Sequence, residues 1–103
     1  MSESAISAQI RFELAKRGVI MFRNNTGMVR YKGGRVVRFG LALGSSDLIG
    51  IRQSDGKFVA IEVKQPGKKP TGAQQMFIDA VKKHNGLAGV AHSVTEALTI
   101  IGE

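Results

Sequence analysis

The spacing of apolar residues divides this chain into predicted helices and strands. The segment from Ser2 to Arg17 has an apolar residue at every fourth position, as on one face of an amphipathic helix. These residues are Ile6, Ile10 and Leu14. A second helix is predicted from about Gly72 to His84, with a stripe at helical spacing formed by Ala73, Met76, Phe77, Ala80 and Val81. Ser93 and Glu96 have the spacing of a capping box, which predicts a last short helix reaching about Ile101.

Short apolar runs between these helices predict strands. Val19–Arg23 and Leu87–Ala91 are two of them. Asp47–Arg52 and Phe58–Lys64 form another pair, with Asp55-Gly56 between them as a strong signal for a two-residue hairpin turn. Nearly every residue of the second strand in this pair is apolar, so we expect it to be buried on both faces of the sheet.

The order of the elements predicts the fold class. Between Met28 and Phe39 we expect an extra hairpin or flap, because Lys32-Gly33-Gly34-Arg35 at its centre favours a turn. Asn24–Gly27 predicts a turn before it. The remaining elements run helix, strand, two-stranded hairpin, helix, strand, helix. This order predicts one α/β domain over residues 1–103, with a mixed central sheet flanked by helices.

Three charged residues gather where the predicted hairpin ends. Glu62 and Lys64 are two apart on one strand, so their side chains point to the same side of the sheet. A two-residue turn at Asp55-Gly56 would place Ile49 opposite Glu62. Asp47 would then face Lys64 and lie diagonal to Glu62, within reach of a shared ion.

Two carboxylates beside a lysine have the chemistry of a magnesium-dependent phosphodiesterase. Mg²⁺ prefers oxygen ligands, takes one or two carboxylates and activates a bound water. Asp47 and Glu62 are the candidate ligands, and the Val63 backbone carbonyl is a third. Lys64 could orient or deprotonate the water, or stabilise the phosphate. A Glu-x-Lys pair alone could be an exposed pair of no consequence. Charges at the end of a buried strand are costly unless partnered, which favours a function.

Composition narrows the class of partner. The formal net charge is +7, which favours an anionic partner and nucleic acid first. Basic residues flank the carboxylates in the sequence and could grip phosphates, or could simply be solvated. These candidates are Arg23, Arg30, Lys32, Arg35, Arg38, Lys68 and Lys69. Tyr31 is the only tyrosine, so recognition of duplex DNA by backbone and shape is favoured over base stacking.

Other classes are excluded by what the sequence lacks. The 103 residues suffice for one compact domain and not for two. The absence of cysteine excludes a disulfide scaffold, a Cys-ligated zinc site and a thiol nucleophile. No apolar run approaches the roughly 18–20 residues of a membrane span, and the polar start has no signal-peptide pattern. We expect a cytoplasmic protein.

Four motifs together resemble the VRR-NUC (virus-type replication-repair nuclease) family, a branch of the PD-(D/E)xK nucleases. They are Glu3 in the first helix, Gly44-Ser45-Ser46-Asp47-Leu48-Ile49-Gly50-Ile51, Phe58-x-x-Ile61-Glu62-Val63-Lys64 and Thr71-x-x-Gln74-x-x-Phe77. The resemblance implies a core of order αβββαβα. It also implies that Asp47 and Glu62 bind Mg²⁺ or Mn²⁺ and that Lys64 is the catalytic lysine. Ser46 stands where the superfamily usually has proline.

The resemblance adds two site residues and a substrate class. Gln74 would match the glutamine of the following helix, although Thr71 and Gln74 also form a capping box. Glu3 would match an acidic residue of the first helix, although an acid there also favours the helix dipole. Small members resemble homodimeric Holliday-junction resolvases, which implies branched DNA as substrate, with Met28–Phe39 as a candidate dimer surface. A nuclease for flaps, nicks or ends, or a non-catalytic DNA-binding module, is the alternative.

Overall fold

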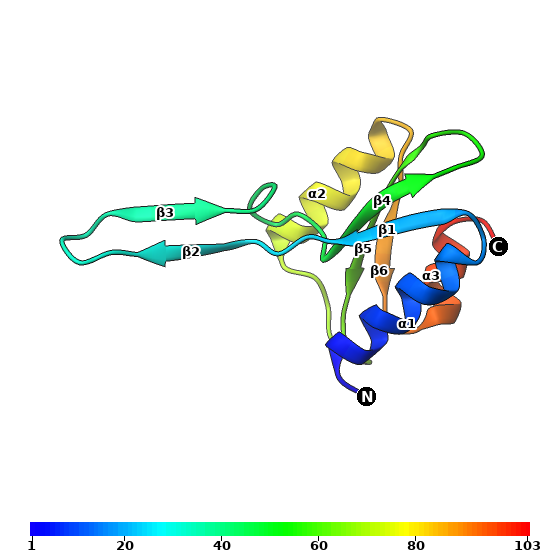
Figure 1. Cartoon of the computed structure of the whole chain (residues 1–103), viewed down its shortest axis with the longest axis horizontal. Coiled ribbons are helices and arrows are strands. Elements are labelled where there is room, and N and C mark those ends of the chain that lie inside the picture. The colour runs from blue at the N-terminus through cyan, green and yellow to red at the C-terminus, as the bar shows by residue number, and fades with distance from the viewer.

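The computed structural model describes all residues, 1–103, and contains three helices and six strands (Figure 1). The helices are α1 (Glu3–Ala15), α2 (Gly72–Lys83) and α3 (Val94–Ile100). The strands are β1 (Val19–Arg23), β2 (Gly27–Arg30), β3 (Val36–Phe39), β4 (Leu48–Arg52), β5 (Phe58–Val63) and β6 (Leu87–Ala91). Each predicted element is present within a few residues of its expected bounds.

The central sheet is mixed, as predicted. Its four strands have the order β1-β4-β5-β6. The first two pairings are antiparallel, and β5 pairs with β6 in parallel through the α2 crossover. Every residue of β5 after Phe58 is buried, which confirms the prediction of a strand covered on both faces.

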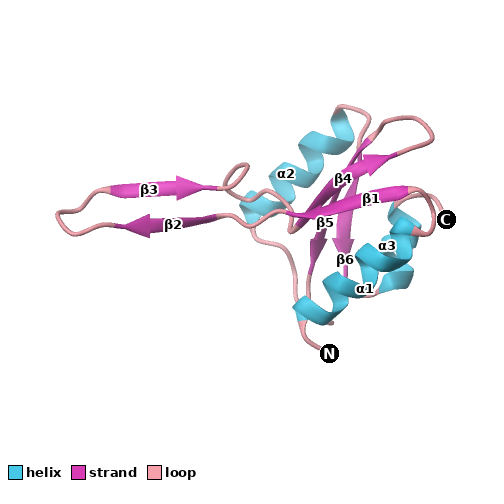
Figure 2. Ribbon diagram, viewed as in Figure 1, coloured by secondary structure: helices cyan, strands magenta, loops and turns pink.

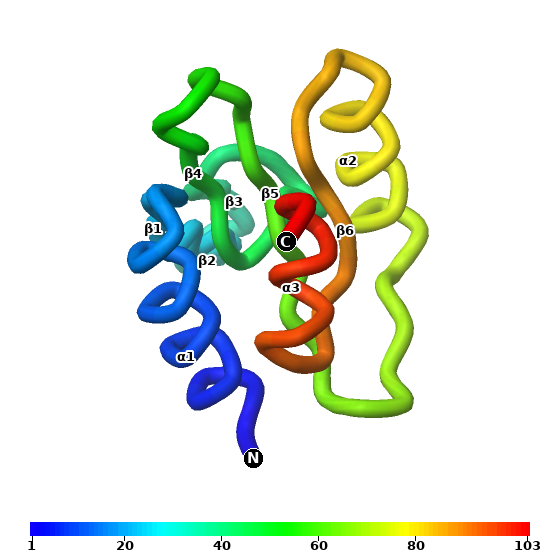
Figure 3. Tube along the Cα trace, turned by 90° about the vertical axis from the view of Figure 1, so that its right-hand side faces the viewer, coloured from blue at the N-terminus to red at the C-terminus, as the bar shows by residue number.

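Helices cover the two faces of the sheet unequally. Helices α1 and α3 lie over one face, in front of the strands in Figure 3. The main core lies between them and the sheet, and includes Ile10, Leu14, Leu48 and Ile61, all completely buried. Helix α2 covers the other face only over β5 and β6, which leaves β1 and β4 without a helix on that side.

The helix starts follow their sequence signals. The Ser2 hydroxyl accepts a hydrogen bond from the Ala5 N–H (3.1 Å), and both halves of the capping box form at the start of α2. At α3 only half of the predicted box forms. The Ser93 hydroxyl accepts from the Glu96 N–H, but the Glu96 carboxylate accepts from the His92 N–H instead of the Ser93 N–H.

The buried face of α2 differs from the predicted stripe. Ile78 is the fully buried residue of this helix, whereas Met76 is 74% exposed. Ile78 packs against Ala60 and Ala88, while Phe77 and Val81 are only partly buried beside them. The helix is therefore turned toward the small residues of β5 and β6. Because the sheet beyond β5 is bare on this side, one flank of the predicted stripe stays in solvent.

The hairpin β4–β5 has a different register from the predicted one. Leu48 pairs with Ile61 and Ile51 with Phe58, so the strands are shifted by two residues. The expected two-residue turn is wrong because the loop is longer: the Gly56 N–H donates to the Arg52 carbonyl (2.7 Å), and Asp55 forms an ion pair with Arg52. A shift of two residues preserves the side-chain faces. The carboxylates therefore stay on neighbouring strands.

The extra hairpin projects from the domain as an arm, defined here as residues 27–39. Strands β2 and β3 pair only with each other and extend away from the central sheet (Figure 2). Asn24–Thr26 continue the chain outward from β1 instead of turning it back, so the turn expected at Asn24–Gly27 is wrong. No helix of the protein has the length and apolarity needed to span a membrane.

Candidate active site

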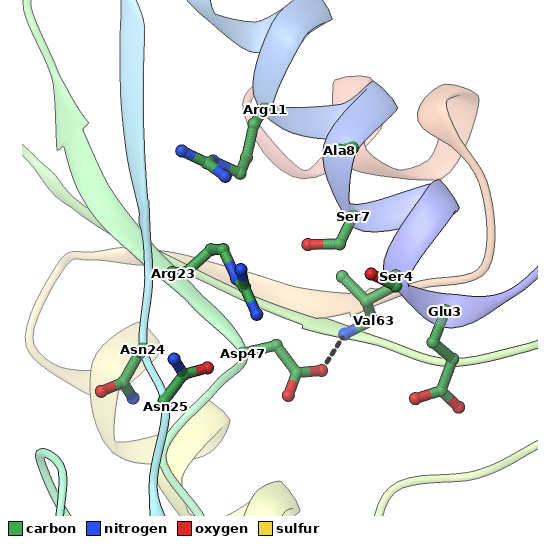
Figure 4. Close-up of a pocket in the computed structure, with 10 residues that line it drawn as sticks. All are labelled: Glu3, Ser4, Ser7, Ala8, Arg11, Arg23, Asn24, Asn25, Asp47 and Val63. Carbon is green, nitrogen blue, oxygen red and sulfur yellow. Dashed lines mark hydrogen bonds between the residues drawn. The ribbon is translucent and has the colours of Figure 1, made fainter.

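The two candidate metal ligands lie on adjacent strands at one end of the β4–β5 hairpin. Asp47 directly precedes β4, and Glu62 lies near the end of β5. The observed register places Asp47 next to Glu62 rather than opposite Lys64. One Asp47 oxygen, Oδ2, accepts a hydrogen bond from the Val63 N–H at 3.0 Å (Figure 4). The Asp47 carboxylate is thus oriented toward the end of β5.

Glu62 is a buried carboxyl group with one unsatisfied oxygen. It is only 2% exposed, and its Oε2 atom has no hydrogen-bond partner. Burial raises the pKa of Glu62 to about 8, and the neighbouring Asp47 carboxylate adds to the rise. The half-buried Lys64 ammonium lowers the pKa, but by less. In the metal-free protein a proton at Glu62 therefore relieves the repulsion between the two carboxylates.

These residues fit a divalent cation of the magnesium type. A cation between Asp47 and Glu62 would give the orphaned Oε2 atom a partner and neutralise the paired charges. The structure has no cluster of three or more His, Cys, Asp or Glu side chains that could hold a metal. Mg²⁺ does not need one, because two carboxylates, a backbone carbonyl and waters suffice. The Val63 carbonyl as a third ligand remains a prediction.

Gln74 forms the capping box weighed from the sequence, and its side chain also contacts the candidate metal ligand Glu62. Its Oε1 atom accepts from the Thr71 N–H (2.8 Å), which completes the capping box. Its Nε2 atom donates to Glu62 Oε1 (3.1 Å). The two ends of one amide therefore fix the start of α2 and the orientation of the Glu62 carboxyl group.

Glu3 lies at the edge of the site instead of between the two carboxylates. Its Oε2 atom accepts a long hydrogen bond of 3.4 Å from the Gln65 N–H, just after Lys64. Its side chain also lines the same cavity as Asp47 (Figure 4). From that position Glu3 ties the first turn of α1 to the segment that follows β5.

Asn24 holds the loop that carries Asp47, and the sequence did not single it out. Its side-chain Nδ2 donates to Ser45 Oγ (2.7 Å) and to the Ser46 carbonyl (2.9 Å). Its backbone N–H donates to the Asp47 carbonyl (2.8 Å). Ser46 is completely buried and its hydroxyl has no partner. The only sequence signal was an asparagine pair directly after a strand, which predicts a turn and not this contact.

A polar cavity of about 230 Å³ opens beside Asp47, between α1 and the end of β1. Arg11 from α1 and Arg23 from β1 both line it, and the Arg23 guanidinium points toward the Asp47 carboxylate (Figure 4). Ser4, Ser7 and Asn25 supply further polar groups. Two arginines next to a carboxylate pair can hold a phosphate group close to a bound cation.

The predicted basic residues separate into three locations. Arg23 lies at the cavity, as expected. Lys68 and Lys69 lie in the loop after β5, where the Lys68 carbonyl contacts His92 Nε2 at 2.8 Å. The rest lie on the arm and not around the carboxylates, so the expectation that they frame the site is wrong. These are Arg30, Lys32, Arg35 and Arg38.

The fold and this site together define a class. A mixed sheet flanked by helices, with Asp47 ahead of one strand and Glu62 at the end of its neighbour, has the arrangement of the PD-(D/E)xK nuclease fold. A solved structure described as a VRR_NUC domain is similar over 96% of this chain and 92% of its own length, with a TM-score of 0.65 and 19% sequence identity.

The sequence comparison identifies the branch of that class. The profile of the VRR-NUC domain family matches residues 1–95. The chain therefore belongs to the VRR-NUC family of nucleases, as the motifs predicted. A search of curated proteins gave no match.

Proposed function

We propose that this protein is a Mg²⁺-dependent DNA endonuclease that hydrolyses phosphodiester bonds in branched DNA and acts as a homodimer. The observation that carries the proposal is the buried Glu62 carboxyl group, whose Oε2 atom lacks a partner beside Asp47. Such a pair is unfavourable unless a proton or a cation joins it. The neighbouring Arg11 and Arg23 are suited to bind the phosphate group of such a substrate.

Each residue of the site has a role in this reaction. Asp47 and Glu62 hold the cation, while the Val63 N–H and Gln74 fix their orientation. When bound, the cation would supply an activated water and would neutralise charge on the phosphate. The Lys64 ammonium group would orient the attacking water and stabilise the negative charge that develops on the phosphoryl oxygens. The Arg11 and Arg23 guanidinium groups bind the phosphate in the cavity.

The basic arm supports duplex DNA of branched shape as the substrate. Four cations on a projecting ribbon can contact phosphates far from the cavity, which a short single strand would not reach. A junction has two equivalent strands to cut, and a two-fold dimer presents two equivalent sites. Incision near a junction by both subunits follows from this symmetry.

A cleavage assay tests the proposal. The protein is incubated with end-labelled four-way junction, flap and plain duplex, in Mg²⁺, in Mn²⁺ and with a chelator. We expect the junction to be cut in the presence of metal and all cutting to stop with the chelator. Glu62→Gln keeps the acceptor for Gln74 but removes the charge, so we expect cleavage to fall about 100-fold or more while DNA binding survives.

The matched control is Glu13→Gln, since Glu13 lies on α1 and pairs with Lys16 and Arg17 away from the cavity. This variant should cut as well as the unchanged protein. Undiminished cleavage by Glu62→Gln would disprove the site. Equal cutting of junction, flap and duplex would disprove the preference for junctions and leave a general nuclease.

A further inference from the structure

The arm has two chemically different faces. Residues opposite each other in an antiparallel pair point to the same side. Val29 pairs with Val37 and Gly27 with Phe39, so these residues form one side. This apolar arm face also carries Tyr31, which is covered by the Arg35 guanidinium at 4.9 Å. On the other side Met28 pairs with Arg38 and Arg30 with Val36, which makes that face basic.

The apolar arm face is organised around one aromatic ring. The Phe39 ring lies so close over Gly27 that a Cβ atom there would clash with the ring carbons. Gly27 thus allows the ring to lie flat on the ribbon. Phe39 is nevertheless 49% exposed, and Val29 and Val37 are 42% and 40% exposed. The packing presents an apolar surface that nothing in the chain covers.

A second apolar surface lies on the bare half of the central sheet. Ile20 pairs with Ile51, and Ile51 pairs with Phe58, so these three form a row across β1, β4 and β5. Phe22 pairs with Ile49 in the next row. Val19 and Met21, which alternate with Ile20 and Phe22 along β1, point into the core under α1, so the two rows face the opposite side. This bare sheet face is where α2 is absent.

No helix of the same chain covers the bare sheet face, and only Leu41 and Ala42, from the loop after β3, border it beside Phe58. Helix α2 lies on the β6 side of the sheet, away from β1 and β4 (Figure 3). A groove of about 680 Å³, lined by Phe58, Phe77 and Val81, continues the apolar surface toward that helix. The chain's own arm points away from the sheet (Figure 1).

We propose that the arm of one copy docks its apolar face on the bare sheet face of a second copy, and that the exchange is reciprocal. The inference names the surfaces of the homodimer in the proposed function and does not depend on the metal chemistry. One chain carries both halves of the contact, which is the requirement for a self-complementary two-fold interface. Docking of both arms would cover all four surfaces at once.

The exposed area is sufficient for a stable dimer. The arm contributes Val29, Tyr31, Val37 and Phe39, and the sheet contributes Ile20, Phe22, Ile51 and Phe58. These side chains are 39–57% exposed. At that exposure they leave on the order of 800 Å² bare on each chain. A standard stable interface takes roughly 800 Å² from each partner.

The chemistry favours a protein surface over DNA as the occupant of these apolar faces. Apart from the Arg35 guanidinium over Tyr31, the apolar arm face offers no charge or hydrogen bond to a phosphate backbone. The opposite face of the arm holds Arg30 and Arg38, whose guanidinium groups remain free for DNA when the apolar face is covered. The arm therefore bridges a second copy on one side and phosphates on the other.

Two neighbouring valines provide the test. Val36 and Val37 are adjacent in β3, equally exposed at 40%, and point to opposite faces. Val37→Glu places a charge in the proposed contact, so we expect the dimer dissociation constant to rise about 100-fold or more. Val36→Glu should leave it unchanged. Sedimentation measures both, and thermal melts confirm that both variants stay folded, since the arm lies outside the core.

Cross-linking locates the partner surface, because the chain has no cysteine of its own. A chain with Val37→Cys is mixed with a differently tagged chain carrying Phe22→Cys and treated with a short bismaleimide. We expect a covalent product that contains both tags. The same mixture with Val36→Cys in place of Val37→Cys should give little of it.

The outcomes separate this inference from the nuclease proposal. A dimer that persists in Val37→Glu, or equal cross-linking from both arm positions, would show that the arm does not dock on the sheet. A monomeric protein that still cuts DNA would overturn the dimer and leave the metal site intact. A protein that becomes dimeric only on DNA, with no mixed cross-link, would assign the apolar arm face to DNA instead.

Discussion

The two hairpins of this chain are alike in local geometry and opposite in surroundings. Both β2–β3 and β4–β5 are antiparallel ribbons closed by loops that contain left-handed glycines. In β4–β5 the second strand is buried almost throughout, while β3 is exposed throughout. The difference lies in the neighbours, since helices and a further strand flank β5 and nothing flanks the arm.

The surroundings decide what each ribbon can do with its charges. At the buried ribbon, a carboxyl group loses its water and its pKa rises to about 8 beside a second carboxylate. A carboxyl pair of this kind is suited to hold a proton or a cation. On the arm, the arginines are exposed to solvent, so they are available for contact with DNA. The comparison predicts that changes at the first ribbon alter reaction rate and changes at the second alter binding.

The largest effect is expected from Lys64→Ala at the buried ribbon. Loss of the ammonium group should lower the rate of cleavage about 10²–10⁴-fold at saturating DNA, with little change in affinity. Lys57→Ala removes the same charge from the other end of this hairpin and should cut normally. Single-turnover cleavage and a separate binding titration measure the two quantities. A loss of affinity without a loss of rate would place Lys64 among the contact residues.

A smaller effect, on affinity alone, is expected at the arm. The double variant Arg30→Gln, Arg38→Gln removes two cations from its basic face. We expect DNA binding to weaken about tenfold or more, and the slope of log affinity against log salt to fall by about 2. Lys82→Gln with Lys83→Gln removes the same charge at the end of α2 and is the control. An unchanged salt slope would show that the arm does not touch phosphates.

The smallest effect is on stability, and it depends on pH. The folded-state pKa of Glu62 is raised from 4.5 to about 8, so the native state holds a proton that the unfolded chain releases. Stability is then fully present below about pH 4.5 and falls as pH rises toward 8. Glu62→Gln removes this loss, and we expect it to melt about 5 °C or more above the metal-free parent at pH 8, and by less at pH 5.

Adding Mg²⁺ should reduce the difference in melting temperature between the parent protein and Glu62→Gln at pH 8. We expect Mg²⁺ to bind the ionised carboxylates and so to stabilise the parent at pH 8 but not Glu62→Gln. Glu13→Gln, changed at an exposed helix position, should follow the parent at every pH. A parent that melts equally at pH 5 and pH 8 would contradict the raised pKa of Glu62.

Most of the fold followed from local patterns. Ile6, Ile10 and Leu14 formed the predicted buried stripe, and the apolar run after Phe58 became the covered strand. The exceptions depended on neighbours. The buried face of α2 was set by the alanines beneath Ile78, and the β4–β5 register by the Arg52–Asp55 ion pair and the longer loop. Neither can be read from the spacing of apolar residues.

The site was less accessible to sequence reasoning. The predicted proximity of Asp47 and Glu62 is correct although the predicted register is wrong, because a shift of two residues leaves each side chain on the same face of the sheet. Arg11 was missed, although Ser4, Ser7 and Arg11 share one side of α1 and the two serines leave room beside the sheet. Arg11 lies at the same cavity as Arg23 because α1 packs beside β1, and the spacing of residues in the sequence does not reveal this packing.

Asn24 gives the molecule a mechanical link between its two ribbons. Asn24 lies directly before the arm, and it forms three hydrogen bonds with the segment Ser45–Asp47. A displacement of the arm that strained these hydrogen bonds would make the position of the Asp47 carboxylate less fixed. An arm held by a bound partner would keep that carboxylate in place. Binding at the arm and order at the active site would then be coupled.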